Sequence, residues 1–398
     1  SRNFKLYDQV EMGFSLARNR SFMNADRQYD VAIVGGGLAG LSLSILLARK
    51  GYRICLFEKE TYPFHKVCGE YISMESWDFL VGLGLPLNDW GLPKIQQLIV
   101  TAPNGESITE LLPLGGFGIS RYKLDDALAA IAKKENVDLF ENTKVNNIHF
   151  DNGHHQIETS SGLFISSVAC ACYGKKANLD VKWKRSFLKH HSQNYVGVKY
   201  HVRVPLPGMQ IALHNFPGGY CGISKIEDER FCLCYLTNSN NLKRSGQSVS
   251  VMEEKILKQN PVLKKLLDEA VFLFEEPVTI AQISFAKKSQ TENHVLCVGD
   301  AAGMITPLCG NGMSMALHAS KIAAESISSF INKEIVRDEM EKRYQKNWNR
   351  QFSSRLRTGR IIQRFFGNPF WSTWLIRIMK PFPSLVRALI RQTHGDKI

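Results

Sequence analysis

Three glycines, at positions 35, 37 and 40, have the spacing G-x-G-x-x-G, which is typical of a turn that binds a pyrophosphate. Gly35 permits a tight turn, Gly37 lets the backbone approach phosphate oxygens, and Gly40 lets a helix pack closely on a strand. Leu38 and Ala39 stand at the start of that helix, where unpaired N–H groups and the helix dipole attract an anion. The alternative is a glycine-rich turn in an ordinary strand–helix–strand unit.

An acidic residue, Glu58, closes the next predicted strand and is followed by Lys59. A carboxylate at this place can accept a hydrogen bond from a ribose 2′-hydroxyl, and its charge would repel a 2′-phosphate. A lone glycine motif is weak evidence, but a strand, the glycines, a helix, a strand and a terminal acid in one unit are specific. These residues predict a dinucleotide site.

A second group of small and polar residues follows an apolar run at 294–298. Gly299 and Asp300 end this run, and a carboxylate beside glycine at the end of a strand is well placed to hold a polyol hydroxyl. A loop with Pro307 and Cys309 then leads into a predicted helix at 313–330, whose dipole can face an anionic group such as the N1–C2=O edge of a reduced flavin. We assign to the cofactor the residues at this helix start: Gly310, Asn311, Gly312 and Met313. The alternative is a further strand–helix crossover without a ligand.

These groups must be positioned by two kinds of sheet. Apolar, β-branched runs predict buried parallel strands at 29–34, 53–57 and 294–298, with a helix at 38–49. Residues 95–102 and 106–112 predict a hairpin around Asn104-Gly105. Alternating patterns with turn residues between them predict further strands of an antiparallel sheet at 195–204, 209–216, 219–226 and 230–235.

Together the two motifs resemble those of the FAD-dependent oxidoreductases that share the para-hydroxybenzoate hydroxylase fold. The resemblance covers roughly residues 29–330 and implies FAD as the cofactor. The segment 63–73 is similar to the Lys-x-Cys-Gly stretch of the geranylgeranyl reductase-like branch, which implies that Cys68 and Gly69 lie at the flavin. Residues 118–129 are similar to the Ser-Arg-x-x-Leu-Asp stretch, which implies that Arg121 lies along FAD.

The fold class expected is therefore α/β, with a Rossmann-like FAD-binding domain, an inserted antiparallel substrate sheet and a C-terminal helical segment. The expected division is as follows: an N-terminal extension at 1–28; a discontinuous FAD-binding domain at 29–90, 119–185 and 278–330; a substrate-binding layer at 91–118 and 186–277; and a basic C-terminal region at 331–398. A chain of 398 residues with 44% hydrophobic and 22% charged residues is globular and large enough for several structural units.

Two residues are candidates for the chemistry itself. The Cys68 thiol could donate a proton, and the neighbouring Lys66 would favour its thiolate; the alternative is a cysteine that shapes the cofactor loop. Tyr220 follows a Gly-Gly turn that resembles a turn beside the flavin in prenyl reductases, and it could supply an apolar face and a hydroxyl. The alternative for Tyr220 is a half-buried hairpin residue. His65 is an acid–base candidate by its ordinary pKa alone.

One departure from the family concerns the electron donor. Many members carry an Asp-Gly pair before the third part of the FAD domain, whereas this chain has Tyr173-Gly174 there. Because no second G-x-G-x-x-G occurs, the reductant is left open between NAD(P)H and another external donor, including an electron-donor protein.

The formal net charge of +13 is concentrated at the C-terminal end. Residues 332–398 contain fifteen Lys or Arg and five Asp or Glu, with aromatic residues between the basic ones from Arg355 onward. Such a stretch is typical of helices that lie on anionic lipid, and equally of a helical cap whose arginines are solvated. Charge alone is not specific for nucleic acid, and no nucleic-acid module is recognisable, so we expect no nucleic-acid partner.

The nine cysteines are odd in number and contain no C-x-x-C pair, so neither a disulfide framework nor a zinc site is indicated. With no apolar run long enough to span a bilayer, we expect a cytoplasmic protein, or one held peripherally at the inner face of the membrane. We expect an enzyme in which reduced flavin reduces an isoprenoid-like or electron-poor C=C bond of a lipophilic small molecule. The alternative is a monooxygenase that acts through a C4a-hydroperoxide. A halogenase is disfavoured because the Trp-x-Trp-x-Ile-Pro signature is absent, and a non-catalytic flavoprotein is the remaining class.

Overall fold

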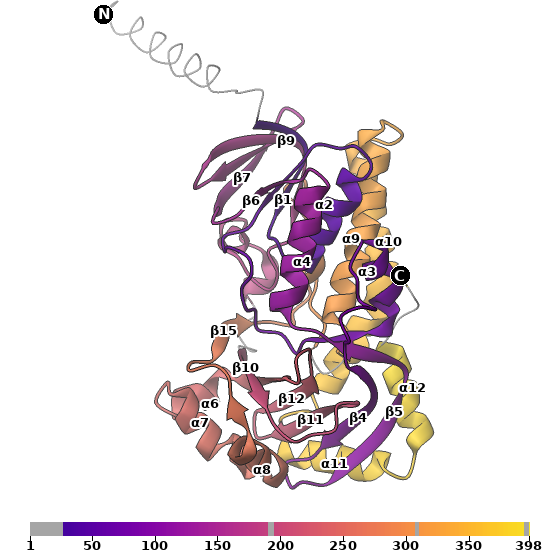
Figure 1. Ribbon diagram of the computed structural model, residues 1–398. Coiled ribbons are helices and arrows are strands. Elements are labelled where there is room, and N and C mark those ends of the chain that lie inside the picture. Colours follow the sequence, from indigo (N-terminus) through magenta and orange to yellow (C-terminus); the bar gives the residue numbers. More distant parts are fainter. Residues whose placement is uncertain (1–26, 190–194, 307–309, 394–397) are drawn as a thin grey trace, which may run out of the picture.

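The structure of the chain is a computed structural model that describes residues 27–189, 195–306, 310–393 and 398. The expected N-terminal extension lies almost wholly outside these residues, as do Pro307 and Cys309 of the predicted loop. The described chain contains two sheets, one above the other in Figure 1, with helices packed on each. The predicted α/β class is confirmed.

The upper sheet has eight strands and a parallel centre, in the order β16-β17-β9-β1-β2-β6. Its strands are β1 (Gln28–Val34), β2 (Ile54–Phe57), β6 (Asp138–Phe140), β7 (Val145–Asp151), β8 (His154–Thr159), β9 (Gly162–Ala171), β16 (Thr291–Glu292) and β17 (Val295–Cys297). All four residues of β2 are buried, because a parallel strand covered on both faces is apolar along its whole length. The strands predicted from apolar runs at 29–34, 53–57 and 294–298 are confirmed.

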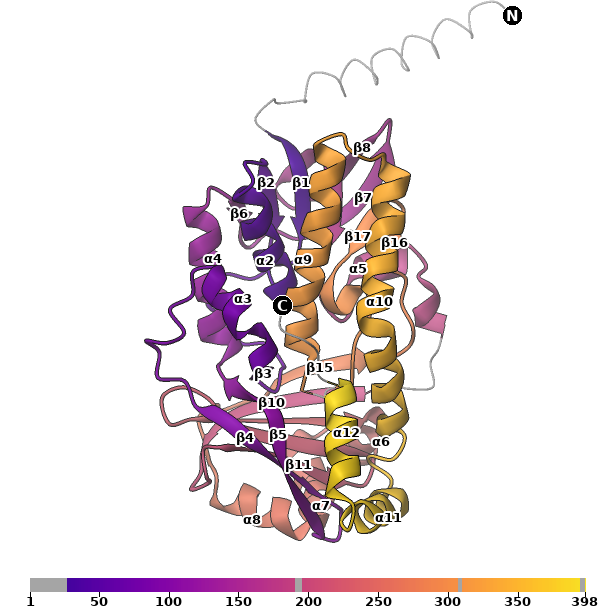
Figure 2. The ribbon, with the colours of Figure 1, turned by 90° about the vertical axis from the view of Figure 1, so that its right-hand side faces the viewer.

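Long helices flank this sheet and carry the motifs. They are α2 (Leu38–Ala48), α3 (Trp77–Gly82), α4 (Arg121–Lys134), α5 (Asn178–Lys182), α9 (Gly312–Ile331) and α10 (Arg337–Gln363). Helix α2 packs on α4 and α9, and α10 packs on the outer side of α9 (Figure 2). Nine of the eleven residues of α2 are buried, so the helix is in contact with its surroundings on nearly every side.

The lower sheet has nine strands. They are β3 (Tyr71–Ser73), β4 (Lys94–Thr101), β5 (Ser107–Gly118), β10 (Tyr195–Arg203), β11 (Gln210–Phe216), β12 (Gly219–Lys225), β13 (Phe231–Asn238), β14 (Val271–Phe272) and β15 (Val278–Ile283). The predicted β4–β5 hairpin and the four predicted strands from 195 to 235 are present.

The lower sheet differs from the prediction in two details. It is not wholly antiparallel, because β11 pairs with β4 in parallel and so joins the hairpin to the later strands. Residues 278–283, expected in the FAD-binding domain, form β15 and pair with β10 in the lower sheet. Residues 278–283 join the lower sheet because the edge of β10 is available for pairing before the apolar run at 294–298 begins.

The two faces of the lower sheet have different partners. On one face, alternate residues of β10 to β13 form an apolar cluster with α7 (Val249–Lys255) and α8 (Pro261–Glu269), next to the short helix α6 (Ser239–Arg244). The opposite face receives the loop that contains Cys68 and Gly69, through hydrogen bonds from Cys232 and Ser224 to backbone carbonyls of that loop. The predicted cofactor loop therefore lies in the seam between the two sheets.

The C-terminal region forms two further helices, α11 (Pro369–Met379) and α12 (Pro383–Thr393), which pack beside β5 and β11. Val386 and Ile390 of α12 are buried against Tyr71, Ile95 and Leu112. One face of these helices therefore caps the lower sheet, while their other face remains exposed.

Candidate functional site

The glycine turn has the geometry for which its glycines were predicted. Gly35 has a φ of +104°, and a Cβ built on it would lie 2.6 Å from the carbonyl oxygen of Cys172. A Cβ on Gly40 would lie 2.0 Å from the carbonyl oxygen of Gly35, so only glycine lets α2 begin this close to β1. A side chain at either position would force the turn and the helix apart.

Two cations lie beside Gly37. A Cβ on Gly37 would be 3.6 Å from Nη2 of Arg121 and 3.8 Å from Nζ of Lys66. Gly37 is the N-cap of α2 and offers no side chain to the first N–H groups of the helix. Free helix N–H groups together with two nearby cations form a cradle suited to a pyrophosphate. The structure therefore brings the predicted Arg121 to the glycine turn.

Asp125 balances these cations and was not found by sequence reasoning. Its carboxylate accepts bidentate hydrogen bonds of 2.7 Å from Arg121 and lies 3.0 Å from Lys66. Burial alone would raise the pKa of Asp125, but Arg121 and Lys66 bring it below its usual value, so the carboxylate is charged at neutral pH. The signal was present in the sequence, because Asp125 is four residues after Arg121 on a predicted helix.

Glu58 is buried at the end of β2 and touches the same turn. One carboxylate oxygen accepts a hydrogen bond of 2.9 Å from the Gly36 N–H, and the other accepts one of 2.8 Å from the Lys59 N–H. The Lys59 side chain itself is mostly exposed and pairs with Glu60. Glu58 is thus placed for a ribose, whereas Lys59 contributes through its backbone.

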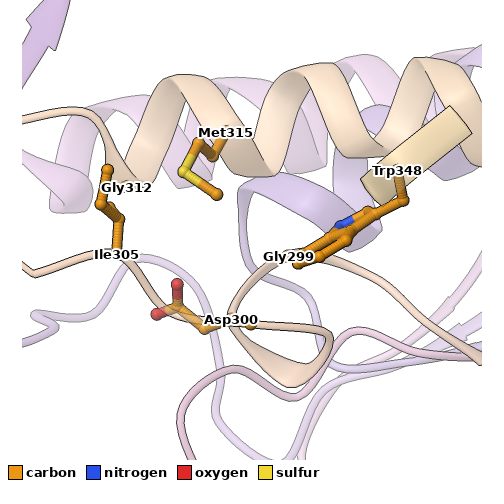
Figure 3. Close-up of a pocket in the computed structure, with 7 residues that line it drawn as sticks. Gly299, Asp300, Ile305, Gly312, Met315 and Trp348 are labelled. Atoms are coloured by element: carbon orange, nitrogen blue, oxygen red, sulfur yellow. The ribbon is translucent and has the colours of Figure 1, made fainter. Parts of the chain in front are cut away.

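The second motif meets the first. Gly299 has a φ of +67°, and a Cβ on it would lie 3.0 Å from Cβ of Ala39 at the start of α2. Asp300 lines a small pocket with Ile305, Gly312 and Met315, and Figure 3 shows its carboxylate directed into that pocket. The carboxylate makes no hydrogen bond or ion pair within the described ranges, so it is open to a hydroxyl group of a ligand.

The start of α9 lies next to this pocket. Gly310, which precedes the N-cap Asn311, has a φ of +64° with Tyr71 packed against it. The Ser314 hydroxyl in the first turn is buried without a hydrogen-bond partner among the residues described. A buried hydroxyl without a partner costs about 1–3 kcal/mol. An acceptor group bound at this helix start would remove that cost.

The loop that contains Cys68 is fastened to the lower sheet. The Cys232 thiol donates a hydrogen bond to the Cys68 carbonyl (3.2 Å), and the Ser224 hydroxyl donates one to the Gly69 carbonyl (3.3 Å). The Cys68 side chain itself is half-buried. Burial raises the pKa of Cys232 well above its usual value, so this thiol stays protonated and keeps its donor.

A buried charged cluster lies directly behind this loop, and sequence reasoning assigned it no such role. Glu70 accepts hydrogen bonds from Nζ of Lys199 (2.5 Å), from the Arg121 N–H (2.8 Å) and from His201, whose Nε2 lies 2.6 Å away. The side chains of Glu70, Lys199 and His201 are at most 1% exposed. Burial raises the pKa of Glu70, but Lys199 and the hydrogen bond from His201 outweigh it and lower the pKa to about 2.

A second histidine, His65, adjoins the cluster. The rings of His65 and His201 are 5.1 Å apart, and each has a buried Nδ1 without a hydrogen-bond partner in the described chain. Burial, assisted by the charge of Lys199, lowers the pKa of His65 to about 4, so His65 is neutral at physiological pH. Glu70, His201 and Cys232 could group as metal ligands, but Lys199 already places its ammonium on the same carboxylate.

Tyr220 lies on the same face of the lower sheet as the cofactor loop. In the register of β12 and β13, Ser224 pairs with Cys232 and Tyr220 pairs with Leu236, and these residues alternate in step. Tyr220 is therefore about 13 Å along the strand from the loop contact at Ser224. Its ring is buried among apolar residues that include Met304 after the Asp300 motif. The structure thus brings Cys68 and Tyr220 to one face but not into contact.

At Tyr173-Gly174, where many members of the family have an Asp-Gly pair, the structure has a network of hydrogen bonds. The Tyr173 hydroxyl donates to Asp180 (2.6 Å), which also accepts from Arg185 (2.9 Å), and both charged groups are buried. The backbone of Tyr173 packs against Gly35. The Tyr173 side chain is therefore tied to Asp180 rather than offering a carboxylate of its own.

Comparisons with known proteins agree with this arrangement. The family described as "FAD binding domain" matches residues 28–159, and the family described as "Squalene epoxidase" matches residues 223–354. Together they cover parts of both sheets.

The chain is similar to curated proteins with several different described functions. Conditioned medium factor receptor 1 of Dictyostelium discoideum is 27% identical over 81% of this chain and 68% of its own length. Tryptophan 2-halogenase of Chondromyces crocatus is 23% identical over 84% of this chain and 67% of its own length. Digeranylgeranylglycerophospholipid reductase 2 of Methanopyrus kandleri is 23% identical over 82% of this chain and 83% of its own length.

Among solved structures, a geranylgeranyl bacteriochlorophyll reductase-like protein from Thermoplasma acidophilum superposes with a TM-score of 0.75. It is 18% identical and the match covers 93% of this chain and 96% of that one. At this identity the likeness shows a common fold across both sheets.

Proposed function

We propose that this chain, an FAD-dependent oxidoreductase with the para-hydroxybenzoate hydroxylase fold, reduces a C=C bond of an isoprenoid-like or electron-poor lipophilic molecule. The observation that carries the proposal is the Cys68-Gly69 loop, which is hydrogen-bonded to the face of the lower sheet that also carries the apolar cluster around Tyr220. A reacting carbon chain needs an apolar wall next to the cofactor loop. Relatives named digeranylgeranylglycerophospholipid reductase support this substrate class.

The residues present fit FAD. Gly37, Arg121 and Lys66 would hold the pyrophosphate, and Glu58 would hold the ribose of the AMP half. Asp300 would hold a hydroxyl of the ribityl chain, since its carboxylate has no other partner in the described part of the chain. Bound and reduced, the flavin supplies a hydride.

The second carbon of the double bond must receive a proton, either from a side chain or from water. The Cys68 thiol and the Tyr220 hydroxyl are the candidate donors, because both lie on the seam face of the lower sheet. His65, with its pKa near 4, is neutral at pH 7 and therefore lacks the acidic proton of an imidazolium. The apolar surroundings of Tyr220 would exclude water from the carbon chain.

A second candidate function is oxygen insertion into the same kind of substrate. The observation that favours it is the match of residues 223–354 to the squalene epoxidase family, which spans β12, β13 and α9. In that case Cys68 would shape the loop without donating a proton.

Product analysis separates the two functions. We would reduce the FAD-loaded protein with dithionite, add geranylgeraniol, and analyse the products by mass spectrometry in two parallel reactions. One reaction is anaerobic in D₂O, and the other contains ¹⁸O₂. Reduction predicts a dihydro product with two deuterium atoms and no ¹⁸O, because the N–H hydrogen of reduced flavin exchanges with D₂O before it is transferred. A product that contains ¹⁸O, formed only in the aerobic reaction, would overturn the reductase and support the oxygenase.

We further propose that the exposed face of the C-terminal helices rests on an anionic membrane surface and admits the lipophilic substrate. Five large apolar side chains on α11, α12 and the turn between them are 44–69% exposed: Phe370, Trp371, Trp374, Phe382 and Leu385. Among the described residues, no helix is long and apolar enough to cross a membrane. A patch of exposed aromatic residues beside cations is typical of contact with the lipid interface.

The structure reduces the number of cations available for that contact. Arg377 pairs with Glu106, and Arg387 lies 3.5 Å from Glu110, so the β4–β5 hairpin neutralises two of the arginines in the basic segment. Lys380 remains without an ion pair within the described ranges. Each free Lys or Arg near an anionic surface contributes about 1 kcal/mol. The aromatic side chains must therefore carry much of the attachment.

A further inference from the structure

A polar cavity of about 150 Å³ adjoins the pocket at Asp300. It lies between the segment 286–290, the segment 302–304 that follows the Gly299-Asp300 motif, and α10. It shares Gly303 and Trp348 with the pocket in Figure 3. A water molecule takes up about 30 Å³ in the liquid, so the cavity has room for a polyatomic group. None of the residues predicted to bind FAD lines it.

The charge of the cavity wall has one sign. Four basic residues line it, namely Lys287, Lys288, Arg357 and Arg360, and no Asp or Glu is among the described residues of its wall. Arg357 and Arg360 are neighbours on α10, and their like charges are mutually unfavourable. Burial and the neighbouring Arg357 together hold the pKa of Arg360 below its usual value.

Three of these cations have no counter-charge among the residues that the structure describes. In the described part of the chain, Lys287, Arg357 and Arg360 make no hydrogen bond and no ion pair. This contrasts with Arg377 and Arg387 of the next helices, which both pair with glutamates of the β4–β5 hairpin. A patch of cations that gathers around a cavity and lacks counter-charges is suited to bind an anion from outside the chain.

The wall also offers uncharged polar groups. Ser353 and Asn349 lie on the same face of α10 as Arg357 and Arg360, and the Ser353 hydroxyl is 3.2 Å from Oδ1 of Asn349. Gln290 closes the inner side and is held by Asn349 and by two backbone carbonyls. Guanidinium forks, an ammonium and a hydroxyl together match the several acceptor oxygens of a phosphate better than a single carboxylate would.

We propose that this cavity binds a phosphate group of a small molecule. Two sources have this chemistry: the headgroup of a phospholipid-like substrate, and a nucleotide that donates electrons. The inference goes beyond the proposed reaction and does not depend on it, because the cavity is defined by its own residues.

Binding in this cavity would change the position of the backbone at residues 300–302. Lys288, which is 3% exposed, donates hydrogen bonds to the carbonyl oxygens of Asp300 (2.8 Å) and Lys175 (2.7 Å). Gln290 donates to the carbonyl oxygen of Ala302 (3.2 Å). An anion that attracts Lys288 or shifts Gln290 would therefore move the backbone that carries the Asp300 carboxylate, and the absorbance of bound flavin would change.

The test measures binding to the FAD-loaded protein by calorimetry and by flavin difference spectra. The probes are inorganic phosphate, glycerol 1-phosphate, NADH and NADPH. The cavity variant is Arg357→Gln/Arg360→Gln, and the matched control is Lys346→Gln/Arg350→Gln, which removes two exposed charges from the same helix. Loss of charge-assisted hydrogen bonds should weaken phosphate binding at least about tenfold in the cavity variant and hardly at all in the control.

The probes also identify the source. Tighter binding of glycerol 1-phosphate than of inorganic phosphate points to a lipid headgroup, and tighter binding of NADPH than of NADH points to a nucleotide phosphate; both support the site. Equal affinities in the wild type and the cavity variant would overturn it, as would an equal loss in both variants or the absence of binding at millimolar concentration. These outcomes leave the product analysis of the proposed reaction untouched.

Discussion

Replacing Glu70 by glutamine should destabilise the protein strongly, because it removes the charge at the centre of the seam between the sheets. Glu70 is fully buried and accepts hydrogen bonds from Lys199, Arg121 and His201. Glutamine keeps the shape and one acceptor oxygen, but it leaves the Lys199 ammonium buried without a counter-charge. Breaking a buried ion pair in this way typically costs about 3–5 kcal/mol.

The pH dependence gives a second estimate of the same effect. The pKa of Glu70 falls from an ordinary value of 4.5 to about 2 in the fold, which corresponds to roughly 3 kcal/mol at neutral pH. Because the pKa is lower in the folded state, this contribution is complete above about pH 4.5. It is lost as the pH falls through the folded pKa toward 2. Such an amount is a large part of a typical stability of 5–15 kcal/mol.

The measurement is guanidinium unfolding of the wild type and Glu70→Gln at pH 7 and at pH 3.5. The matched control is Glu229→Gln, since the Glu229 side chain is 83% exposed and pairs with Lys225 at the surface. The control should change the free energy of unfolding by less than about 1 kcal/mol. We expect the difference between wild type and Glu70→Gln to shrink at pH 3.5. A loss below about 1 kcal/mol at pH 7, or a loss independent of pH, would refute the role given to the cluster.

Three further predictions concern the cofactor, the proton and the membrane. Asp300→Ala should lower the FAD occupancy of the purified protein without unfolding it, with the exposed Asp338→Ala as control; unchanged occupancy would remove Asp300 from the site. Cys68→Ser should slow substrate reduction by about a hundredfold in single-turnover experiments while leaving FAD affinity within about threefold, whereas a change below about threefold in rate would assign Cys68 to packing. Trp371→Gln/Trp374→Gln should abolish flotation on anionic vesicles, while Leu163→Gln/Val181→Gln on the upper domain should not; equal flotation of both variants would leave α11 as a cap of the lower sheet.

The cofactor turn could be predicted from the sequence because its chemistry and its local structure use the same residues. Gly35 and Gly40 are required by the close packing of α2 on β1, and Gly37 is predicted to let a phosphate approach, so the spacing of the three carries both kinds of information. The strands around them are continuous apolar runs, which predict burial on both faces. Nothing from distant parts of the chain is needed to recognise this unit.

The seam could not be predicted in the same way. Glu70 follows the recognised Cys68-Gly69 pair, but Lys199 and His201 lie on β10, about 130 residues away in the chain. Within β10 they alternate with apolar residues, a pattern that also describes a strand with one face in water. Lys199 becomes buried because β10 pairs with β13 in this register and because the Cys68-Gly69 loop covers this face of the sheet. The alternation within β10 alone does not indicate this burial.

The edge of β10 also explains why residues 278–283 form β15 in the lower sheet. Val278–Ile283 alternates exposed and half-buried residues and has no strong apolar signal of its own. It becomes a strand because the edge of β10 offers unpaired backbone groups at Gly197 to Lys199. A strand that forms because a neighbouring strand offers backbone partners need not have a strand pattern in its own sequence.

The main effect of the buried cluster of Glu70, Lys199 and His201 is to orient the Cys68-Gly69 loop, rather than to stabilise the fold more than apolar residues would. An ion pair transferred from water to a protein interior often gains no more free energy than a well-packed apolar group of similar size would. Glu70, however, has a φ of +54° and hydrogen-bonds both to β10 and to the Arg121 N–H at the start of α4. Because those partners belong to the lower sheet and to the cofactor domain, the carboxylate sets how the Cys68-Gly69 loop lies between them. Apolar side chains would fill the same space without specifying that orientation, and a reaction at a bound cofactor depends on the orientation of the reacting groups.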